Sequence, residues 1–187
     1  MRLFVAIELD HAVKRVMLKT IDRLAEFRKT VRWVRESQMH LTMKFLGDVP
    51  DEQVSEVSDA CARVASACES FEMVVDRCGC FPAGGGVRVI WCGSQSESPA
   101  IVACAGRLDA ACGDLGFEPE SRPFSAHMTV GRVREDRTNG RLRDAVQRLQ
   151  PGSATQSVKE MTLFQSTLSP QGPTHTALGR FPFSGTG

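Results

Sequence analysis

The sequence predicts an α+β fold made of two similar halves, and three observations support this. The segment order is strand, helix, hairpin, helix, then strands, helix, strand, helix and a final hairpin, which suits helices placed outside antiparallel sheets. The tetrapeptide His40-Leu41-Thr42-Met43 recurs as His127-Met128-Thr129-Val130, once in each half. The chain length of 187 residues fits one domain. We therefore expect residues 1–187 to form a single domain with two lobes.

The first half is expected to contain three strands and two helices. Apolar residues 3–7 predict an opening strand, and Asp10 is a suitable N-cap for a helix over about residues 11–29. Residues 31–34 predict a short strand that pairs as a hairpin with the strand beginning at His40. A second helix is expected over about residues 51–67, where apolar residues recur at helical spacing.

The second half repeats this mixture of strands and helices. Strands are expected at 71–75 and 87–92, separated by a turn from Cys78 to Gly86. The glycines of that turn indicate a flexible loop, since no helix N-terminus follows to bind phosphate. The remaining expected segments are a helix from Pro99 to about 115, a strand at 127–134, a helix at 139–149, and strands at 158–168 and 174–181 joined by a turn at 169–173.

The two repeated tetrapeptides each present a histidine and a threonine on one face of a strand. Side chains alternate along a strand, so His40 and Thr42 share one face, and His127 and Thr129 do the same in the second copy. If both strands line one cleft, one imidazole can accept a proton while the other donates one. Hydroxyls and nearby cations can hold phosphate oxygens, so the pattern indicates phosphate chemistry.

Two basic residues follow the motifs. Strict alternation places Lys44 on the face of His40, where we expect it to line the cleft, and places Phe45 in the core. Arg132 lies five residues after His127, on the opposite face of a regular strand, so it reaches the cleft only through a twist or bulge. We take both cations as candidate substrate-binding residues.

Composition excludes several classes of function. The net charge of +1 gives no general attraction to nucleic acid, so an RNA must be bound by a local patch or at its end. No apolar run is long enough to cross a membrane, and the opening segment is too short for a signal peptide. Seven scattered cysteines indicate reduced thiols in a cytoplasm. Cys78-Gly79-Cys80 lacks the second ligand pair of a zinc site, so we expect no metal and no cofactor.

Four blocks of the chain resemble the bacterial and archaeal RNA 2′,3′-cyclic phosphodiesterases. These enzymes belong to the two-histidine phosphoesterase superfamily, and some were first named 2′-5′ RNA ligases. The resemblance runs in order over nearly the whole chain. The blocks are Arg2-Leu3-Phe4-Val5-Ala6-Ile7, Arg32-Trp33-Val34 with His40 to Gly47, Pro123 to Arg132, and Leu163 to Pro170.

The resemblance implies a bilobal fold with antiparallel sheets lining a central cleft and helices outside. It also implies metal-independent hydrolysis of a 2′,3′-cyclic phosphate, at an RNA end or in a cyclic nucleotide, to a 2′-phosphate. We expect the protein to be a monomer. By the family pattern His40 is the proton donor to the 3′ oxygen and His127 is the proton acceptor. Thr42 and Thr129 would ligate the phosphate. The residues alone do not show which histidine is the acid and which is the base.

The chain departs from the family pattern at two positions. Ala126 stands where proline is common, which removes a rigid approach to His127. His175 stands where an aromatic residue is common, and because the chain has no tyrosine, base stacking falls to Phe or Trp. We expect His175 to be solvated or at the cleft rim, and His11 to be solvated.

Three other functions remain open from the sequence. A 2′-5′ RNA ligase would run the same chemistry backwards. A module that binds RNA ends or nucleotides without turnover would keep the motifs but lose the reaction. A metal hydrolase would use both histidines as ligands, although no acidic residue lies within either motif to complete the set.

Overall fold

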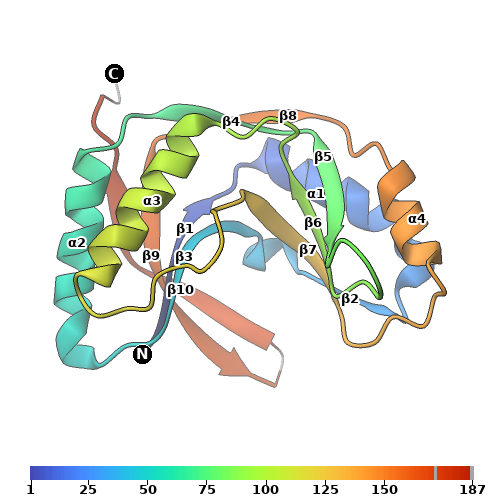
Figure 1. Ribbon diagram of the computed structural model, residues 1–187, viewed down its shortest axis with the longest axis horizontal. Coiled ribbons are helices and arrows are strands. Elements are labelled where there is room, and N and C mark those ends of the chain that lie inside the picture. The colour runs from blue at the N-terminus through green and yellow to red at the C-terminus, as the bar shows by residue number, and fades with distance from the viewer. Residues whose placement is uncertain (171, 186–187) are drawn as a thin grey trace.

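The computed structural model of the protein describes residues 1–170 and 172–185, and Figure 1 shows its arrangement of sheets and helices. The strands are β1 (Arg2–Glu8), β2 (Val31–Trp33), β3 (His40–Asp48), β4 (Phe71–Val75), β5 (Arg77–Phe81), β6 (Val89–Gly93), β7 (His127–Val133), β8 (Ala154–Val158), β9 (Glu160–Ser169) and β10 (Gly172–Pro182). The helices are α1 (His11–Arg23), α2 (Val54–Ser66), α3 (Pro99–Gly113) and α4 (Arg141–Arg148). Short 3-10 helices cover Ala25–Phe27, Glu36–Gln38 and Asp51–Gln53.

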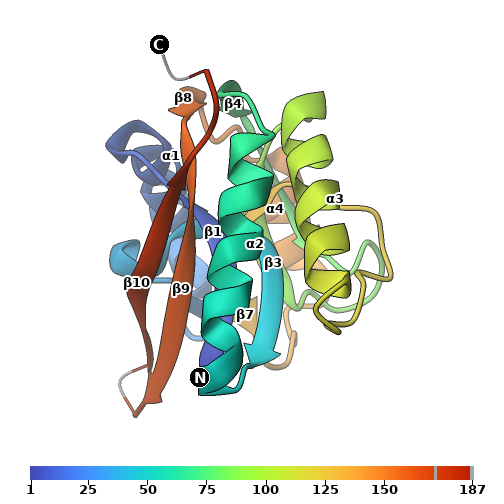
Figure 2. The same ribbon diagram turned by 90° about the vertical axis from the view of Figure 1, so that its left-hand side faces the viewer.

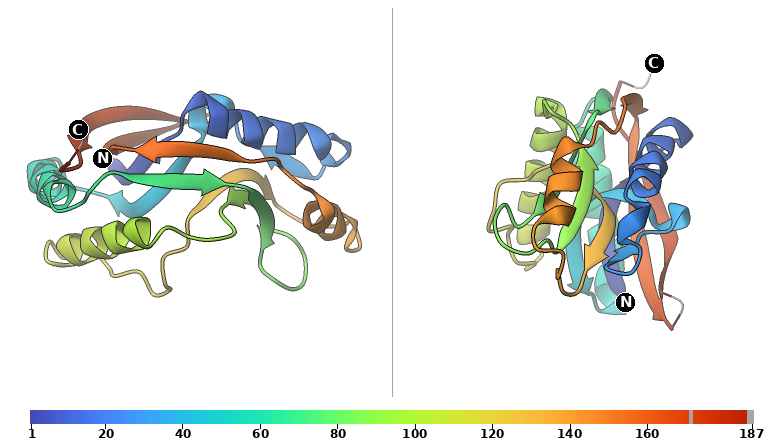
Figure 3. Two further views of the ribbon diagram at one scale, coloured as in Figure 1. Left: turned by 90° about the horizontal axis from the view of Figure 1, so that it is seen from above. Right: turned by 90° about the vertical axis from the view of Figure 1, so that its right-hand side faces the viewer.

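Two four-stranded antiparallel sheets carry the fold. One sheet has the strand order β10-β9-β1-β3, and the other has the order β2-β7-β6-β5. Strands β4 and β8 form a separate two-stranded sheet that extends along the two larger sheets (Figure 3). Helices α2 and α3 pack on the first sheet, and α1 and α4 pack on the second (Figures 1 and 2). The expected α+β architecture, with antiparallel sheets and helices outside, is confirmed.

The motif strands β3 and β7 pair with their neighbours in the same register. β3 pairs with β1, and β7 pairs with β6, each in antiparallel orientation. The pairs of the two sheets correspond one to one. The pair His40–Glu8 corresponds to His127–Gly93, Thr42–Ala6 corresponds to Thr129–Trp91, and Lys44–Val5 corresponds to Gly131–Ile90. The internal repeat, visible in the sequence only as two tetrapeptides, therefore extends to the pairing of whole strands.

A bulge follows the threonine of each motif. The register skips Met43 in β3 and Val130 in β7, so in each strand the residue after the threonine has no partner opposite it. An extra residue reverses the alternation beyond it. Arg132 consequently lies on the same face of β7 as His127 and Thr129. This is the bulge that strand alternation required if Arg132 was to reach that face.

The same bulge makes the expectation for Lys44 and Phe45 wrong. Lys44 is only 2% exposed, and its Nζ donates to Asp109 Oδ1 at 2.6 Å and to the Glu118 carbonyl at 2.7 Å. Phe45, expected in the core, is 47% exposed. Lys44 is therefore an internal ion-pair partner of α3 and does not face the side of β3 that carries His40.

Other differences concern strand partners. β2 was expected to form a hairpin with β3 but pairs with β7, where Arg32 lies opposite Arg132. The pairing is close, because a Cβ on Gly131 would lie 2.5 Å from Val31 and 2.8 Å from the Trp33 ring. Only glycine permits this approach.

Two strands were missed, and several ends differ. β5 occupies part of the expected Cys78–Gly86 turn, and β8 precedes β9. The first helix ends at Arg23, before a short 3-10 helix, rather than at Lys29. The expected turn at 169–173 includes Gln171, which lies outside the described residues. Within the described residues, no helix is long and apolar enough to cross a membrane.

Candidate active site

His40 lies at the start of β3 on an aromatic support. The ring of Phe4, from the adjacent strand β1, lies 4.8 Å from the imidazole between centroids, tilted by 34°. Phe4 is 3% exposed and stacks in turn on Phe164 of β9 at 5.3 Å. From the sequence, Phe4 is only one residue of an apolar strand. No signal in the sequence identifies it as the support of His40, because their contact depends on the long-range pairing of β1 with β3.

His175, on β10, completes this aromatic cluster. Its ring meets that of His40 edge-on at 5.2 Å, with an interplanar angle of 89°, and contacts Phe4 at 4.9 Å. Its Nδ1 is buried and has no hydrogen-bond partner among the described residues. Burial lowers the pKa of His175. The solvated position considered for this histidine is therefore wrong, and His175 is a direct neighbour of His40.

The surroundings of His40 disfavour its charged form. Burial lowers the pKa of His40 to about 4, and the nearby His175 acts in the same direction. A backbone hydrogen bond with Gln38 opposes this change, while the positive charge of Arg132 adds to it. In the protein without ligand, His40 is therefore a neutral imidazole at neutral pH.

His127 is oriented by the backbone just before it. Its Nδ1 lies 2.8 Å from the carbonyl oxygen of Ser125. Because a carbonyl only accepts hydrogen bonds, Nδ1 carries the hydrogen and Nε2 of a neutral ring keeps its lone pair. Ala126, at the position where we expected proline to be common in related sequences, donates its N–H to Glu97 Oε1 at 2.5 Å. A proline could not make that hydrogen bond, so here Glu97 holds the segment that leads into His127.

An aromatic pair lies beside His127. The Phe81 ring meets the imidazole edge-on at 5.3 Å and stacks on Trp91 at 5.4 Å, with an interplanar angle of 28°. Phe81 is 38% exposed. A flat, exposed aromatic ring next to a histidine is a surface on which a nucleobase can stack.

The two motifs lie near each other although they belong to different sheets. Residues of β3 and β7 lie within 8 Å of each other between Cα atoms. Arg132, on the face of His127, is close enough for its charge to act on His40. We call His40, Thr42, His127, Thr129 and Arg132 the motif surface. Thr42 and Arg132 are exposed and the other three are half-buried.

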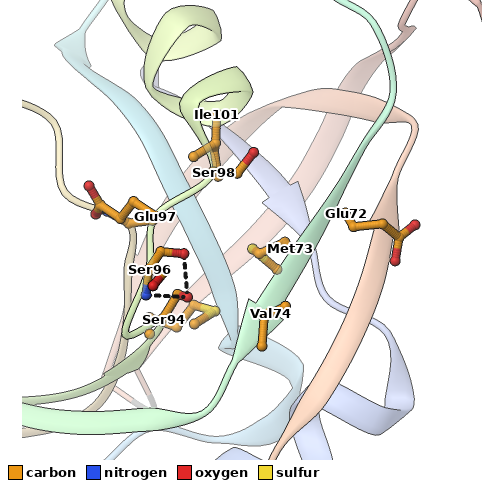
Figure 4. A pocket seen from close by; sticks show the side chains of 11 residues that line it. Glu72, Met73, Val74, Ser94, Ser96, Glu97, Ser98 and Ile101 are labelled. Carbon is orange, nitrogen blue, oxygen red and sulfur yellow. Dashed lines mark hydrogen bonds between the residues drawn. The ribbon is translucent and has the colours of Figure 1, made fainter.

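A separate surface pocket of about 200 Å³ lies outside this surface (Figure 4). Met73, Ile101 and Met128 contribute its apolar lining, and Ser94 and Ser96 hydrogen bond to each other at its edge. Met128 leaves β7 on the face opposite the motif residues. The pocket is therefore on the other side of β7 from the candidate chemistry. Among residues 1–170 and 172–185, no three His, Cys, Asp or Glu side chains are arranged to hold a metal ion.

Comparison of the sequence identifies a family and curated relatives. The LigT-like phosphoesterase family matches residues 7–91 and 93–175, one motif in each stretch. An RNA 2′,3′-cyclic phosphodiesterase of Methanothermobacter thermautotrophicus is 31% identical over 96% of this chain and 97% of the relative. An enzyme of the same name from Archaeoglobus fulgidus is 30% identical over 97% of this chain and 99% of the relative.

Solved structures show the same fold over nearly the full length. TT0787 of Thermus thermophilus is 25% identical with a TM-score of 0.82, covering 100% of both chains. E. coli LigT in complex with 3′-AMP is 26% identical with a TM-score of 0.79, covering 98% of both chains. The same E. coli protein has been solved with ATP, at 26% identity and a TM-score of 0.71, covering 97% of this chain and 96% of that chain.

Proposed function

The chain belongs to the LigT-like phosphoesterase family, and from this membership we propose that it hydrolyses 2′,3′-cyclic phosphates at RNA ends to 2′-phosphates. It is an enzyme that cleaves cyclic phosphodiesters. The observation that carries the proposal is that both halves present a His-x-Thr sequence in strands of the same bulged register.

The reaction needs one base and one acid on opposite sides of phosphorus. His127 accepts a proton from water through Nε2, and the water oxygen forms a new bond to phosphorus. The bond from phosphorus to the 3′ oxygen breaks, and His40 gives its proton to that oxygen. The phosphate stays on the 2′ oxygen, and exchange with solvent returns each histidine to its starting state.

The orientation of His127 supports its role as base. Nδ1 donates its hydrogen to the Ser125 carbonyl oxygen, so the neutral ring can accept a proton only at Nε2. Thr42 and Thr129 donate their hydroxyl hydrogens to phosphate oxygens. The negative charge that develops in the transition state then meets two donors.

The acid role of His40 requires that the substrate change its protonation. In the free protein its pKa is about 4, mainly because it is buried. A phosphate anion beside the ring favours the imidazolium, so binding raises the pKa of His40 and takes up a proton. His40 is therefore protonated, and can act as the acid, only when the anion is bound.

This coupling predicts that anion binding strengthens as pH falls. Sulfate is a suitable probe, since its charge stays constant between pH 5 and 8. Below the ordinary histidine pKa of about 6.5 and above the free-protein value, each bound sulfate brings a proton to His40. We expect the Kd for sulfate, measured by calorimetry, to fall several-fold from about pH 7.5 to about pH 5.5. A pH-independent Kd, or one that changes equally in His40→Ala, would contradict the coupling.

The function is tested with a nucleoside 2′,3′-cyclic phosphate as substrate. We expect the 2′-monoester as product and the same rate in excess EDTA. A 3′-monoester would overturn the assignment of His40 as donor, and loss of the rate in EDTA would favour a metal hydrolase. An RNA with a cyclic phosphate end and a 5′-hydroxyl acceptor distinguishes a ligase, which would join the ends faster than it hydrolyses them.

We further propose that the chain acts as a monomer in the cytoplasm, as one domain of two lobes. Helix α1 comes from the first half but packs against β7 of the second half, which joins the two halves into one domain. Light scattering should return the monomer mass of 20.5 kDa.

The cysteines support the cytoplasm as the compartment. All seven are free, and burial raises the pKa of the Cys61 and Cys92 thiols to about 12.

A further inference from the structure

We propose that Arg32 and Arg132 form a second anion-binding subsite, beside the catalytic histidines, that binds another phosphate of the same RNA strand. The inference rests on the proposed function and adds to it a contact with a second phosphate of the substrate. The preferred substrate is then an oligonucleotide with a cyclic end rather than a cyclic mononucleotide.

The two arginines lie directly opposite each other. β2 and β7 are antiparallel, and Arg32 is the register partner of Arg132. Directly opposed residues of antiparallel strands point to the same face, so two guanidinium groups share one side of this sheet edge. Like charges in such a pair repel each other and destabilise the strand pairing. This arrangement is unfavourable unless an anion binds between them.

Neither arginine has an acidic partner within the part of the chain that the structure describes. The ion pairs of that part involve other cations, such as Arg180 with Glu8 at 2.7 Å and Arg141 with Glu26 at 3.2 Å. Both Arg32 and Arg132 are exposed. Their charges are therefore available to a ligand without first breaking an internal ion pair.

The pair is continuous with the proposed catalytic site. Arg132 acts on His40 through its charge, as described above. On its other side, Arg32 reaches β10, since its Nη2 lies 3.6 Å from the position of a Cβ on Gly172. Gln38 joins the same region by donating to the Pro173 carbonyl at 2.7 Å. The arginines thus extend from His40 toward the beginning of β10.

The chemistry of this subsite favours a phosphodiester. Guanidinium groups bind phosphate oxygens in a planar, two-pronged geometry that lysine cannot reproduce. The adjacent catalytic phosphorus belongs to the end of a nucleic acid strand, whose next phosphate is joined to it covalently. With a net charge of only +1, the protein has no general attraction for RNA, so local cations must supply it. A cyclic mononucleotide has no second phosphate for Arg32.

The test compares uridine 2′,3′-cyclic phosphate with a short oligouridylate that has the same cyclic end. For the wild-type protein we expect a higher kcat/KM on the oligonucleotide. Arg32→Gln should lower the ratio of oligonucleotide to mononucleotide kcat/KM by about ten- to a hundredfold, the size of one lost charge-assisted contact. Arg63→Gln, an exposed arginine on the outer helix α2, is the matched control and should keep the wild-type ratio.

Salt dependence gives an independent readout. Each phosphate contact to a single strand adds roughly −0.7 to the slope of log affinity against log salt concentration. The oligonucleotide should therefore lose kcat/KM more steeply with salt than the mononucleotide, and Arg32→Gln should reduce that difference. The melting temperature of Arg32→Gln should be unchanged or higher, because the variant removes a like-charge pair.

The outcomes separate this inference from the proposed function. If Arg32→Gln keeps the wild-type ratio and salt slopes while the mononucleotide is hydrolysed, the second subsite is wrong and the function stands. If the wild-type protein hydrolyses neither substrate, the proposed function is wrong. A ratio lowered equally by Arg63→Gln would mean general electrostatic attraction and would also overturn the subsite.

Discussion

Replacing His127 with alanine is expected to lower kcat for nucleoside 2′,3′-cyclic phosphate hydrolysis by roughly 10²–10⁴-fold. The substitution removes Nε2, the atom that accepts the proton of the attacking water. His40→Ala should have an effect of the same size, because the 3′ oxygen then leaves without a proton. Steady-state kinetics with a chromatographic product assay measures both.

Two controls make this prediction specific. His11→Ala changes an exposed histidine at the start of α1 and should leave kcat unchanged. The double variant His40→Ala/His127→Ala should be little slower than the slower single variant, since residues that act as a unit in one step are not additive. Losses that multiply would mean that the two histidines act independently. A single variant that keeps more than about a tenth of the wild-type rate would contradict its assigned role.

Replacing Lys44 with alanine is expected to destabilise the protein by about 2–5 kcal/mol while sparing catalysis. The change opens a cavity and removes the cation that pairs with Asp109 at 2.6 Å. The hydrogen bond from Lys44 lowers the pKa of Asp109, so the ion pair contributes above the carboxyl's ordinary pKa and is lost as pH falls. Urea unfolding at neutral pH gives the change in unfolding free energy.

The kinetic result distinguishes the structural role from the one that strand alternation suggests. At a temperature where Lys44→Ala remains folded, its kcat/KM should stay within about threefold of wild type, because the buried ammonium does not contact substrate. Lys19→Ala, an exposed lysine on α1, should change the unfolding free energy by less than about 0.5 kcal/mol. A large loss of kcat/KM in folded Lys44→Ala would mean that Lys44 contributes to substrate binding after all.

The sequence predicts the fold class because its signals are local. Alternation in β3 and β7 identifies two strands with a histidine and a threonine on one face. All four helices are also identified, although the first ends at Arg23 rather than at about Lys29. Resemblance over four blocks then supplies the bilobal family. These features depend on each segment alone, so no tertiary information is needed to find them.

The bulges at Met43 and Val130 could not be predicted from the sequence. An unpaired residue reverses the alternation of the side chains that follow it, and the residue types of a strand do not show where such a residue lies. For this reason Lys44 was assigned to the wrong face, while Arg132 was recognised only as needing such a bulge.

Residues that depend on long-range pairing were missed for a similar reason. Phe4 and His175 meet His40 only because β1 and β9 bring β10 into the same sheet as β3. The partner of β2 was misassigned because neighbouring segments suggested a hairpin, whereas Gly131 allows β7 to approach instead. Sequence order alone does not specify which strands meet.

A crystal structure of the protein with bound inorganic phosphate tests most directly whether both motifs act on one phosphorus. The account predicts a single anion within hydrogen-bonding distance, about 2.7–3.2 Å, of both His40 and His127, with the Thr42 and Thr129 hydroxyls on its oxygens. An anion bound by one motif alone, or by residues away from both, would contradict it.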